Sequence, residues 1–143
     1  MSIQAILLPM FAMVALAFAL LFWTLYLRFR ALRRGEVSPH QVRLREKAWP
    51  PYVIQIGNAF HNQLELPMLF YVVVLLALIT KSLDAVVYVL MWMFVISRYM
   101  HTFIHATYNR LDHRTAMFLV GAVALLLMWV IVVARIYLFP PEL

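Results

Sequence analysis

Four apolar stretches, each long enough to cross a membrane as a helix, decide what this chain can fold into. They lie near residues 3–27, 53–79, 83–107 and 115–139, and a helix needs about 20 residues to span a bilayer. Of the 143 residues, 66% are hydrophobic and only 13% are charged, which is too little charge to cover a soluble domain. We therefore predict an all-α, transmembrane four-helix bundle that forms a single domain over residues 1–143.

The first stretch and the absence of cysteine limit the chemistry further. The stretch has no basic region before it and no small-residue cleavage site after it, so it is expected to be a retained helix rather than a signal peptide. The chain has no cysteine, which excludes disulfides, zinc–thiolate sites, iron–sulfur clusters and a thiol nucleophile of its own. Any thiol chemistry must therefore use a sulfur that belongs to a ligand.

The basic residues predict the orientation of the four stretches. Between the first two stretches lie Arg28, Arg30, Arg33, Arg34, Arg43, Arg45 and Lys47. The link between the third and fourth adds Arg110 and Arg114, whereas the opposite side carries only Lys81 and Arg135. The positive-inside rule then places both loops in the cytoplasm and both termini on the other side. The net charge of +6 is explained by orientation and anionic lipid head groups, so we expect lipids rather than nucleic acid as partners.

Two polar stripes lie inside the apolar stretches. The first polar stripe is Asn58, His61, Asn62 and Glu65, and the second polar stripe is Arg98, His101, Thr102 and His105. Both follow the spacing i, i+3, i+4, i+7, which predicts one face of a helix. The predicted topology puts both about 5–20 Å below the cytoplasmic surface, at 1.5 Å of rise per residue. Ionisable groups in a bilayer core are costly and indicate a functional site.

The two polar stripes and the arginines at the same membrane depth form one polar layer, and the charges of this layer favour an anionic ligand. Arg28, Arg98 and Arg114 are permanently cationic, and Glu65 is the only carboxylate in the two polar stripes. Glu65 can pair with Arg98, because an unpaired buried charge would be very costly. The remaining charge suits carboxylates or phosphates, and neutral hydrogen bonds to the same ligand can come from Asn58, Asn62, Thr102 and Tyr108.

Several segments resemble the MAPEG family, the membrane-associated proteins of eicosanoid and glutathione metabolism. Residues 61–70, His-Asn-Gln-Leu-Glu-Leu-Pro-Met-Leu-Phe, resemble its helix-two signature of Asn-x-x-Glu followed by a proline and apolar residues. Residues 98–105, Arg-Tyr-Met-His-Thr-Phe-Ile-His, resemble the helix-three signature Arg-x-x-His-Thr. Arg114 and Thr115 fall where the family starts helix four, and Arg28 falls where it ends helix one. The resemblance covers essentially the whole chain and is closest to small bacterial members.

This resemblance implies a homotrimer in a bacterial inner membrane, with glutathione as co-substrate at each subunit interface. The residues that match the family's glutathione site are Arg28, Asn62, Glu65, Arg98, His101 and Arg114. The family's enzymes use an arginine like Arg114 to stabilise the glutathione thiolate, and a nearby cation does lower the pKa of a thiol. The resemblance therefore implies a glutathione-dependent transferase or peroxidase that acts on lipophilic electrophiles or lipid hydroperoxides.

The chain departs from the family's glutathione-using members at three positions. Asn58 and His61 stand where those members usually carry arginines, and His105 stands where a tyrosine is common. Fewer permanent cations should weaken the hold on carboxylates. The family also includes a non-enzymatic lipid-binding member, so the alternative function is a non-catalytic lipid- or fatty-acid-binding protein that uses the same cleft.

Simpler interpretations exist for individual residues. The first polar stripe could be a seam of interhelical hydrogen bonds, each worth about 0.6 kcal/mol. His101 with His105, and His61 with Glu65, have metal-ligand spacing, but the stretches hold too few histidines for a di-iron enzyme, and we predict no metal. Arg114 could anchor its helix at lipid phosphate. The predicted site consists of Arg114 as the catalytic residue and, as ligand-binding residues, Arg28, Asn58, His61, Asn62, Glu65, Arg98, His101, His105, Tyr108 and Thr115.

Overall fold

The computed structural model describes residues 2–43 and 48–138, and over these ranges it contains helices and no strands. The helices are α1 (Ile3–Arg33), α2 (Pro39–Val42), α3 (Pro51–His61), α4 (Leu66–Ile79), α5 (Ala85–Ala106) and α6 (Leu111–Leu138). Four segments are long and apolar enough to cross a membrane: α1, α3 with α4, α5 and α6. The prediction of an all-α membrane bundle is confirmed. Arg45, Lys47 and the last residue of the fourth predicted stretch, Phe139, lie outside the described residues.

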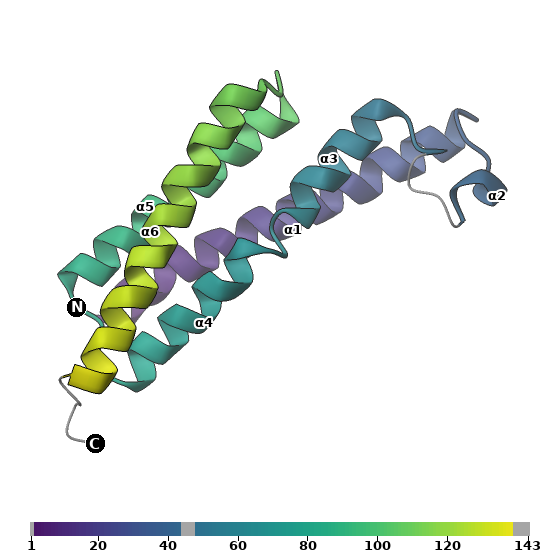
Figure 1. The fold of residues 1–143 in the computed structure, drawn as a ribbon. Helices are drawn as coiled ribbons and strands as arrows, with labels where there is room; N and C mark the ends of the chain where they lie inside the picture. Colours follow the sequence, from purple (N-terminus) through teal and green to yellow (C-terminus); the bar gives the residue numbers. More distant parts are fainter. Residues whose placement is uncertain (1, 44–47, 139–143) are drawn as a thin grey trace.

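The four segments form two layers that diverge toward one end (Figure 1). The α5 and α6 helices pack against each other as an antiparallel hairpin, and α1 packs along α3. The α4 helix packs against α6, while α5 also contacts α1 and α3. The start of α1 and the end of α6 lie at the closely packed end of the bundle, and the α5–α6 turn lies at the end where the hairpin separates from α3 (Figure 1).

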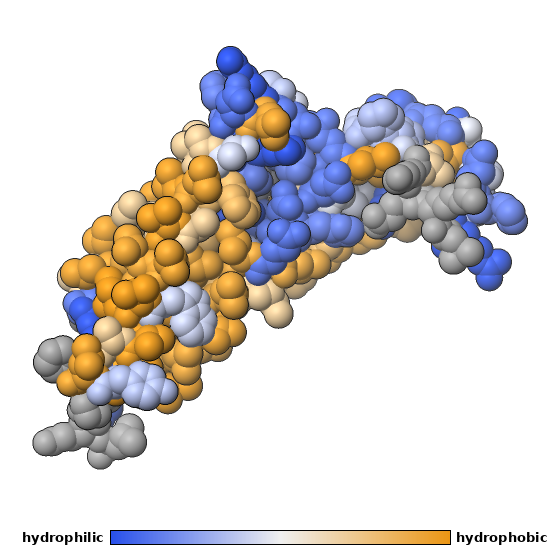
Figure 2. Space-filling model, viewed as in Figure 1, coloured by the Kyte–Doolittle hydropathy of each residue, from blue (hydrophilic) through white to orange (hydrophobic). Residues whose placement is uncertain are grey.

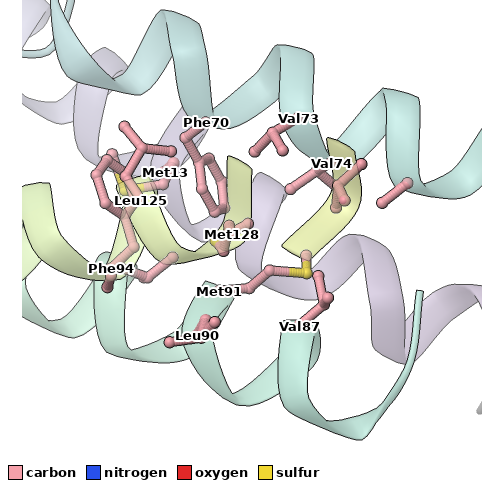
Figure 3. Packing of buried hydrophobic residues seen from close by; sticks show 14 residues of the cluster. Met13, Phe70, Val73, Val74, Val87, Leu90, Met91, Phe94, Leu125 and Met128 are labelled. Atoms are coloured by element: carbon pink, nitrogen blue, oxygen red, sulfur yellow. The ribbon is translucent and has the colours of Figure 1, made fainter. Parts of the chain in front are cut away.

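The closely packed end is held by an apolar core to which α1, α4, α5 and α6 all contribute (Figure 3). At its centre the rings of Phe70 and Phe94 stack with their centroids 4.7 Å apart, and Met13 and Met128 are fully buried beside them. Large apolar side chains also remain exposed along every long helix, and they cover most of the surface at this end (Figure 2). Such a surface suits contact with lipid rather than water.

The second apolar stretch is two helices rather than the single predicted helix. Pro67 has no N–H to donate, and its ring would clash with the carbonyl of Gln63 in a continuous helix. The chain therefore leaves α3 after His61 and starts α4 at Leu66. Residues 62–65 form the α3–α4 break. Two hydrogen bonds hold this break against α5: Gln63 Nε2 donates to Thr102 Oγ1 at 3.0 Å, and Arg98 Nη2 donates to the Asn62 carbonyl at 3.2 Å.

This break corrects the expectation that the first polar stripe lies on one helical face. Asn58 and His61 belong to α3, but Asn62 is its C-cap and Glu65 is the N-cap of α4. The second polar stripe does lie on one continuous helix. All four of its side chains are on the buried face of α5, each at most 6% exposed.

Gly121 allows the close approach of α6 to α5. A Cβ atom at this position would lie 2.5 Å from Ser97 Oγ and 3.7 Å from Arg98 Cδ. We expect Gly121→Ala to lower the free energy of unfolding by about 1–3 kcal/mol through overpacking, measured by thermal unfolding in detergent. Gly57→Ala is the matched control, because its Cβ would meet only Thr24 Cγ2 at 3.9 Å. Equal melting temperatures for the two variants would show that the α5–α6 contact does not require glycine.

An ion pair joins the α4–α5 turn to the end of α6. Arg135 Nη2 lies 2.6 Å from Asp84 Oδ2, and Arg135 Nη1 donates to the Ser82 carbonyl at 2.8 Å. Asp84 also caps α5, accepting from the Val87 N–H at 3.0 Å. The hydrogen bond from Arg135 lowers the pKa of Asp84 from 3.8 to about 2. A carboxyl whose pKa is lower in the folded state stabilises that state above its unfolded pKa, and the contribution is lost as the pH falls through the folded pKa.

We therefore expect the melting temperature to fall between about pH 4 and pH 2, and Asp84→Asn to remove part of that dependence. The control is Asp112→Asn, because the Asp112 carboxylate is 80% exposed and lies 3.7 Å from Arg110 Nε. Surface pairs of this kind contribute little. A pH profile unchanged by Asp84→Asn would show that the Arg135 contact does not stabilise the fold.

Candidate functional site

A polar cleft of about 500 Å³ opens where α3 and the α3–α4 break face α5 and α6. Figure 2 shows hydrophilic residues gathered between the start of α6 and α3. The residues that line the cleft are Asn58, His61, Asn62, Glu65, His101, His105, Arg114, Thr115 and Phe118. All of them except Phe118 belong to the predicted site. The cleft volume is within the range of about 300–1,000 Å³ that small-molecule sites occupy.

Hydrogen bonds join the three sides of this cleft. Asn62 Nδ2 lies 3.4 Å from His101 Nε2 and 3.3 Å from His105 Nδ1, which connects the end of α3 to α5. His101 Nδ1 lies 2.9 Å from the main-chain oxygen of Arg114, which connects α5 to α6. The two polar stripes therefore lie at the same level of the bundle.

Arg114 is placed by the turn that starts α6. Its Nη1 donates to Asn109 Oδ1 at 2.8 Å, and Asn109 adopts a left-handed backbone with φ +47°. Asparagine tolerates this conformation better than most residues. The guanidinium is consequently held at the edge of the cleft, in the first turn of α6 next to Thr115.

Arg98 lies beneath the cleft rather than in it. The residue is 0% exposed, and its guanidinium donates to the Asn62 carbonyl and lies 5.6 Å from the Phe118 ring. The carbonyl end of α3 and the face of an aromatic ring both favour a positive charge. The suggested Glu65–Arg98 pair is wrong: Glu65 is exposed, and no ion pair joins the two within the described residues.

Two other predicted residues lie outside the cleft. Arg28 borders an adjoining cavity of about 20 Å³ that shares Asn58 and His61 with the cleft, and its guanidinium lies 5.5 Å from the Trp49 ring. Tyr108 is exposed, and its hydroxyl oxygen lies 3.2 Å from His113 Nδ1. The structure thus brings Arg28 close to the predicted group but leaves Tyr108 apart from it.

Three residues of the site region were not predicted from the sequence: Gln55, Gln63 and Phe118. Gln63 fixes the break, and Gln55 Nε2 donates to the His105 carbonyl at 2.7 Å. A glutamine amide inside an apolar stretch is itself a signal that a polar partner is near. Phe118 carries no such signal, since an apolar residue in a membrane helix has no distinguishing feature.

The cleft lining combines one permanent cation, Arg114, with one carboxylate, Glu65, and three histidines. Such a set can hold a ligand that carries both anionic groups and an amine. Within the part of the chain that the structure describes, no three histidine, aspartate or glutamate side chains gather closely enough to hold a metal ion. The arrangement is therefore suited to binding and polarising a small polar molecule.

A bundle of four segments long and apolar enough to cross a membrane, with a polar cleft open between its helices, defines a multi-pass membrane protein. Comparison with family models gives a match to the MAPEG family over residues 6–134, and the chain belongs to this family. The family includes glutathione transferases and peroxidases. No curated protein and no solved structure matched the chain.

Proposed function

We propose that this protein is a membrane-embedded, glutathione-dependent transferase or peroxidase and that Arg114 stabilises the glutathione thiolate. The observation that carries the proposal is the position of Arg114 in one cleft with Glu65 and two histidines of α5. The guanidinium favours the charged form of a thiol beside it and so lowers its pKa. The thiolate, not the thiol, is the nucleophile.

The remaining cleft residues match the other groups of glutathione, which has two carboxylates, one ammonium and one thiol. Glu65 is the only carboxylate among the lining residues that the structure describes, and it is suited to the ammonium group. Asn58 and His61 can donate to a carboxylate, and Arg28 lines the small adjoining cavity that they share. Because neither Asn58 nor His61 is a permanent cation, we expect weaker binding than an arginine pair would give.

The proposed chemistry begins with attack by the thiolate. In transfer, its sulfur bonds to an electrophilic carbon and the leaving group departs with the bonding electrons. In peroxide reduction, the sulfur takes the distal oxygen, the alcohol leaves after protonation, and a second glutathione then displaces hydroxide to form the disulfide. Exposed apolar side chains next to lining residues in the sequence, such as Leu64 before Glu65 and Leu119 after Phe118, support delivery of a lipophilic substrate through the bilayer.

A homotrimer is part of this proposal. Asn58, His61 and Glu65 are exposed in a single chain although they lie within a membrane-crossing segment. Polar groups facing lipid are costly, so a second copy that covers the cleft would remove this cost. The number of copies, three, is what the resemblance to the family implies, and native mass spectrometry of the detergent-solubilised protein should report three chains.

The direct test is turnover by the purified protein in lipid nanodiscs. We expect saturable conjugation of glutathione to chlorodinitrobenzene, or glutathione oxidation driven by a fatty-acid hydroperoxide. A second candidate is the non-catalytic lipid- or fatty-acid-binding protein. It is favoured by the exposed apolar surface and by Asn58 and His61 at positions where glutathione-using members usually carry arginines. Absence of both activities, together with lipid that co-purifies at a fixed ratio, would overturn the enzyme proposal in favour of this candidate.

A further inference from the structure

We infer that the Asn62 side-chain amide fixes opposite tautomers in His101 and His105, and that His105 presents its Nε2–H to the cleft ligand as a neutral donor. The assignment of tautomers follows from the hydrogen bonds alone. The role toward a thiolate rests on the proposed function.

The tautomer of His101 follows from its contact with α6. Its Nδ1 lies 2.9 Å from the Arg114 main-chain oxygen, and a carbonyl oxygen can only accept, so Nδ1 carries the hydrogen. In a neutral ring Nε2 is then an acceptor. Asn62 Nδ2, a donor-only group, lies 3.4 Å from this nitrogen and fills that role.

The second hydrogen of the same amide determines the state of His105. Asn62 Nδ2 lies 3.3 Å from His105 Nδ1, and because an amide nitrogen only donates, Nδ1 must be unprotonated. The hydrogen of His105 is therefore on Nε2. One amide group thus donates to two rings and gives them opposite tautomers.

The reverse orientation of the amide is disfavoured by charge. If the Asn62 oxygen faced the rings, His101 would have to donate from Nε2 as well as from Nδ1 and would become an imidazolium. His101 is 4% exposed and lies one helical turn after Arg98, which is itself fully buried and has no carboxylate paired with it in the described ranges. A second buried cation in this place would be very costly.

Hydrogen bonds to the main chain at Asn62 and at His105 hold this arrangement in place. The break before Pro67 makes Asn62 the C-cap of α3, and Arg98 bonds its carbonyl. Gln55 Nε2 bonds the carbonyl of His105. The amide and the two rings are therefore positioned by main-chain contacts and not only by their own weak hydrogen bonds.

His105 Nε2 is left available for a ligand. It has no hydrogen-bond partner within the described residues and, unlike Arg98 Nε and Nη1, it is not shielded from the surface of the molecule. Because His105 lines the same cleft as Arg114, its N–H can bond a thiolate there. A hydrogen bond to the charged form lowers the thiol pKa without adding a second cation. A tyrosine hydroxyl at this position would also be a neutral donor.

The tautomers can be read directly from the nitrogen chemical shifts of ¹⁵N-histidine-labelled full-length protein in nanodiscs at neutral pH. We expect a neutral His101 protonated on Nδ1 and a neutral His105 protonated on Nε2. Asn62→Leu should convert His105 to a tautomer mixture and leave His101 unchanged, whereas the control Asn58→Leu should change neither. An imidazolium at His101, or Nε2 protonation of both rings, would overturn the inference whether or not glutathione binds.

The role toward the thiolate needs a second readout, the ultraviolet absorbance of bound glutathione thiolate. We expect His105→Phe to reduce the thiolate fraction about tenfold or more at a pH below the thiol pKa, the effect of losing a hydrogen bond to a charged group. His105→Tyr should restore it. An unchanged thiolate fraction in His105→Phe would overturn the donor role. If wild-type protein shows the two tautomers but binds no glutathione, the proposed function fails while the tautomer assignment stands.

Discussion

Arg114→Ala is expected to lower the glutathione-conjugation rate about a hundredfold or more. Removing one preorganised group that stabilises an anion, here the glutathione thiolate, typically has an effect of this size. Among the described residues that line the cleft, Arg114 is the only one with a permanent positive charge. Without it, the thiol of bound glutathione should keep a higher pKa, and a smaller fraction should be present as the nucleophile. Steady-state kinetics in nanodiscs measure the effect, and the pH at half-maximal rate should rise.

Arg110→Ala is the matched control for this experiment. Arg110 lies one turn earlier, its side chain is 64% exposed, and its contact with Asp112 is a surface pair of 3.7 Å. We expect its rate to stay within about twofold of wild type, because exposed pairs contribute little. The melting temperature of Arg114→Ala should stay close to that of wild type, because His101 bonds the main-chain oxygen of residue 114 and not its guanidinium. Equal loss in both variants would instead support a general role for this turn at the membrane surface.

Arg98→Ala is expected to lower the free energy of unfolding by about 2–5 kcal/mol, the range for emptying a large buried site. Arg98 is fully buried between the α3–α4 break and Phe118. Truncation would leave a cavity there and remove the donor to the Asn62 carbonyl. Thermal unfolding in detergent, followed by circular dichroism, measures the loss.

Arg98→Met separates volume from charge at this position. Methionine refills most of the space, and burying a neutral side chain avoids the desolvation cost of a guanidinium whose Nε and Nη1 have no partner in the described residues. We therefore expect a melting temperature equal to or above that of wild type. A loss as large as that of Arg98→Ala would show that the bond to the Asn62 carbonyl, rather than packing, stabilises the break.

The helical segments and the polar layer could be predicted because each leaves a strong local pattern. Apolar runs of membrane-crossing length are confirmed as α1, α3 with α4, α5 and α6. The second polar stripe keeps its spacing because α5 contains no proline and remains continuous. The predicted orientation toward the cytoplasm stays a prediction.

The remaining features depend on contacts between distant segments. The spacing of Asn62 and Glu65 predicted one continuous helix, but Pro67 interrupts it. The bonds from Arg98 and Gln63 that hold the break link residues far apart in the sequence. Charge alone suggested that Arg98 would meet Glu65. Its actual partners are a main-chain carbonyl and an aromatic ring, for which sequence spacing gives no signal.

The central claim, that the cleft between α3, α5 and α6 holds glutathione, is tested most directly by isothermal titration calorimetry of the protein in detergent. Saturable binding of glutathione is predicted for wild type, with affinity about tenfold or more weaker in Glu65→Gln, which removes the charged partner of the ligand's ammonium, and unchanged in Asp112→Asn. Folded wild-type protein that gives no saturable heat, or a Glu65→Gln variant that binds as tightly as wild type, would contradict the claim.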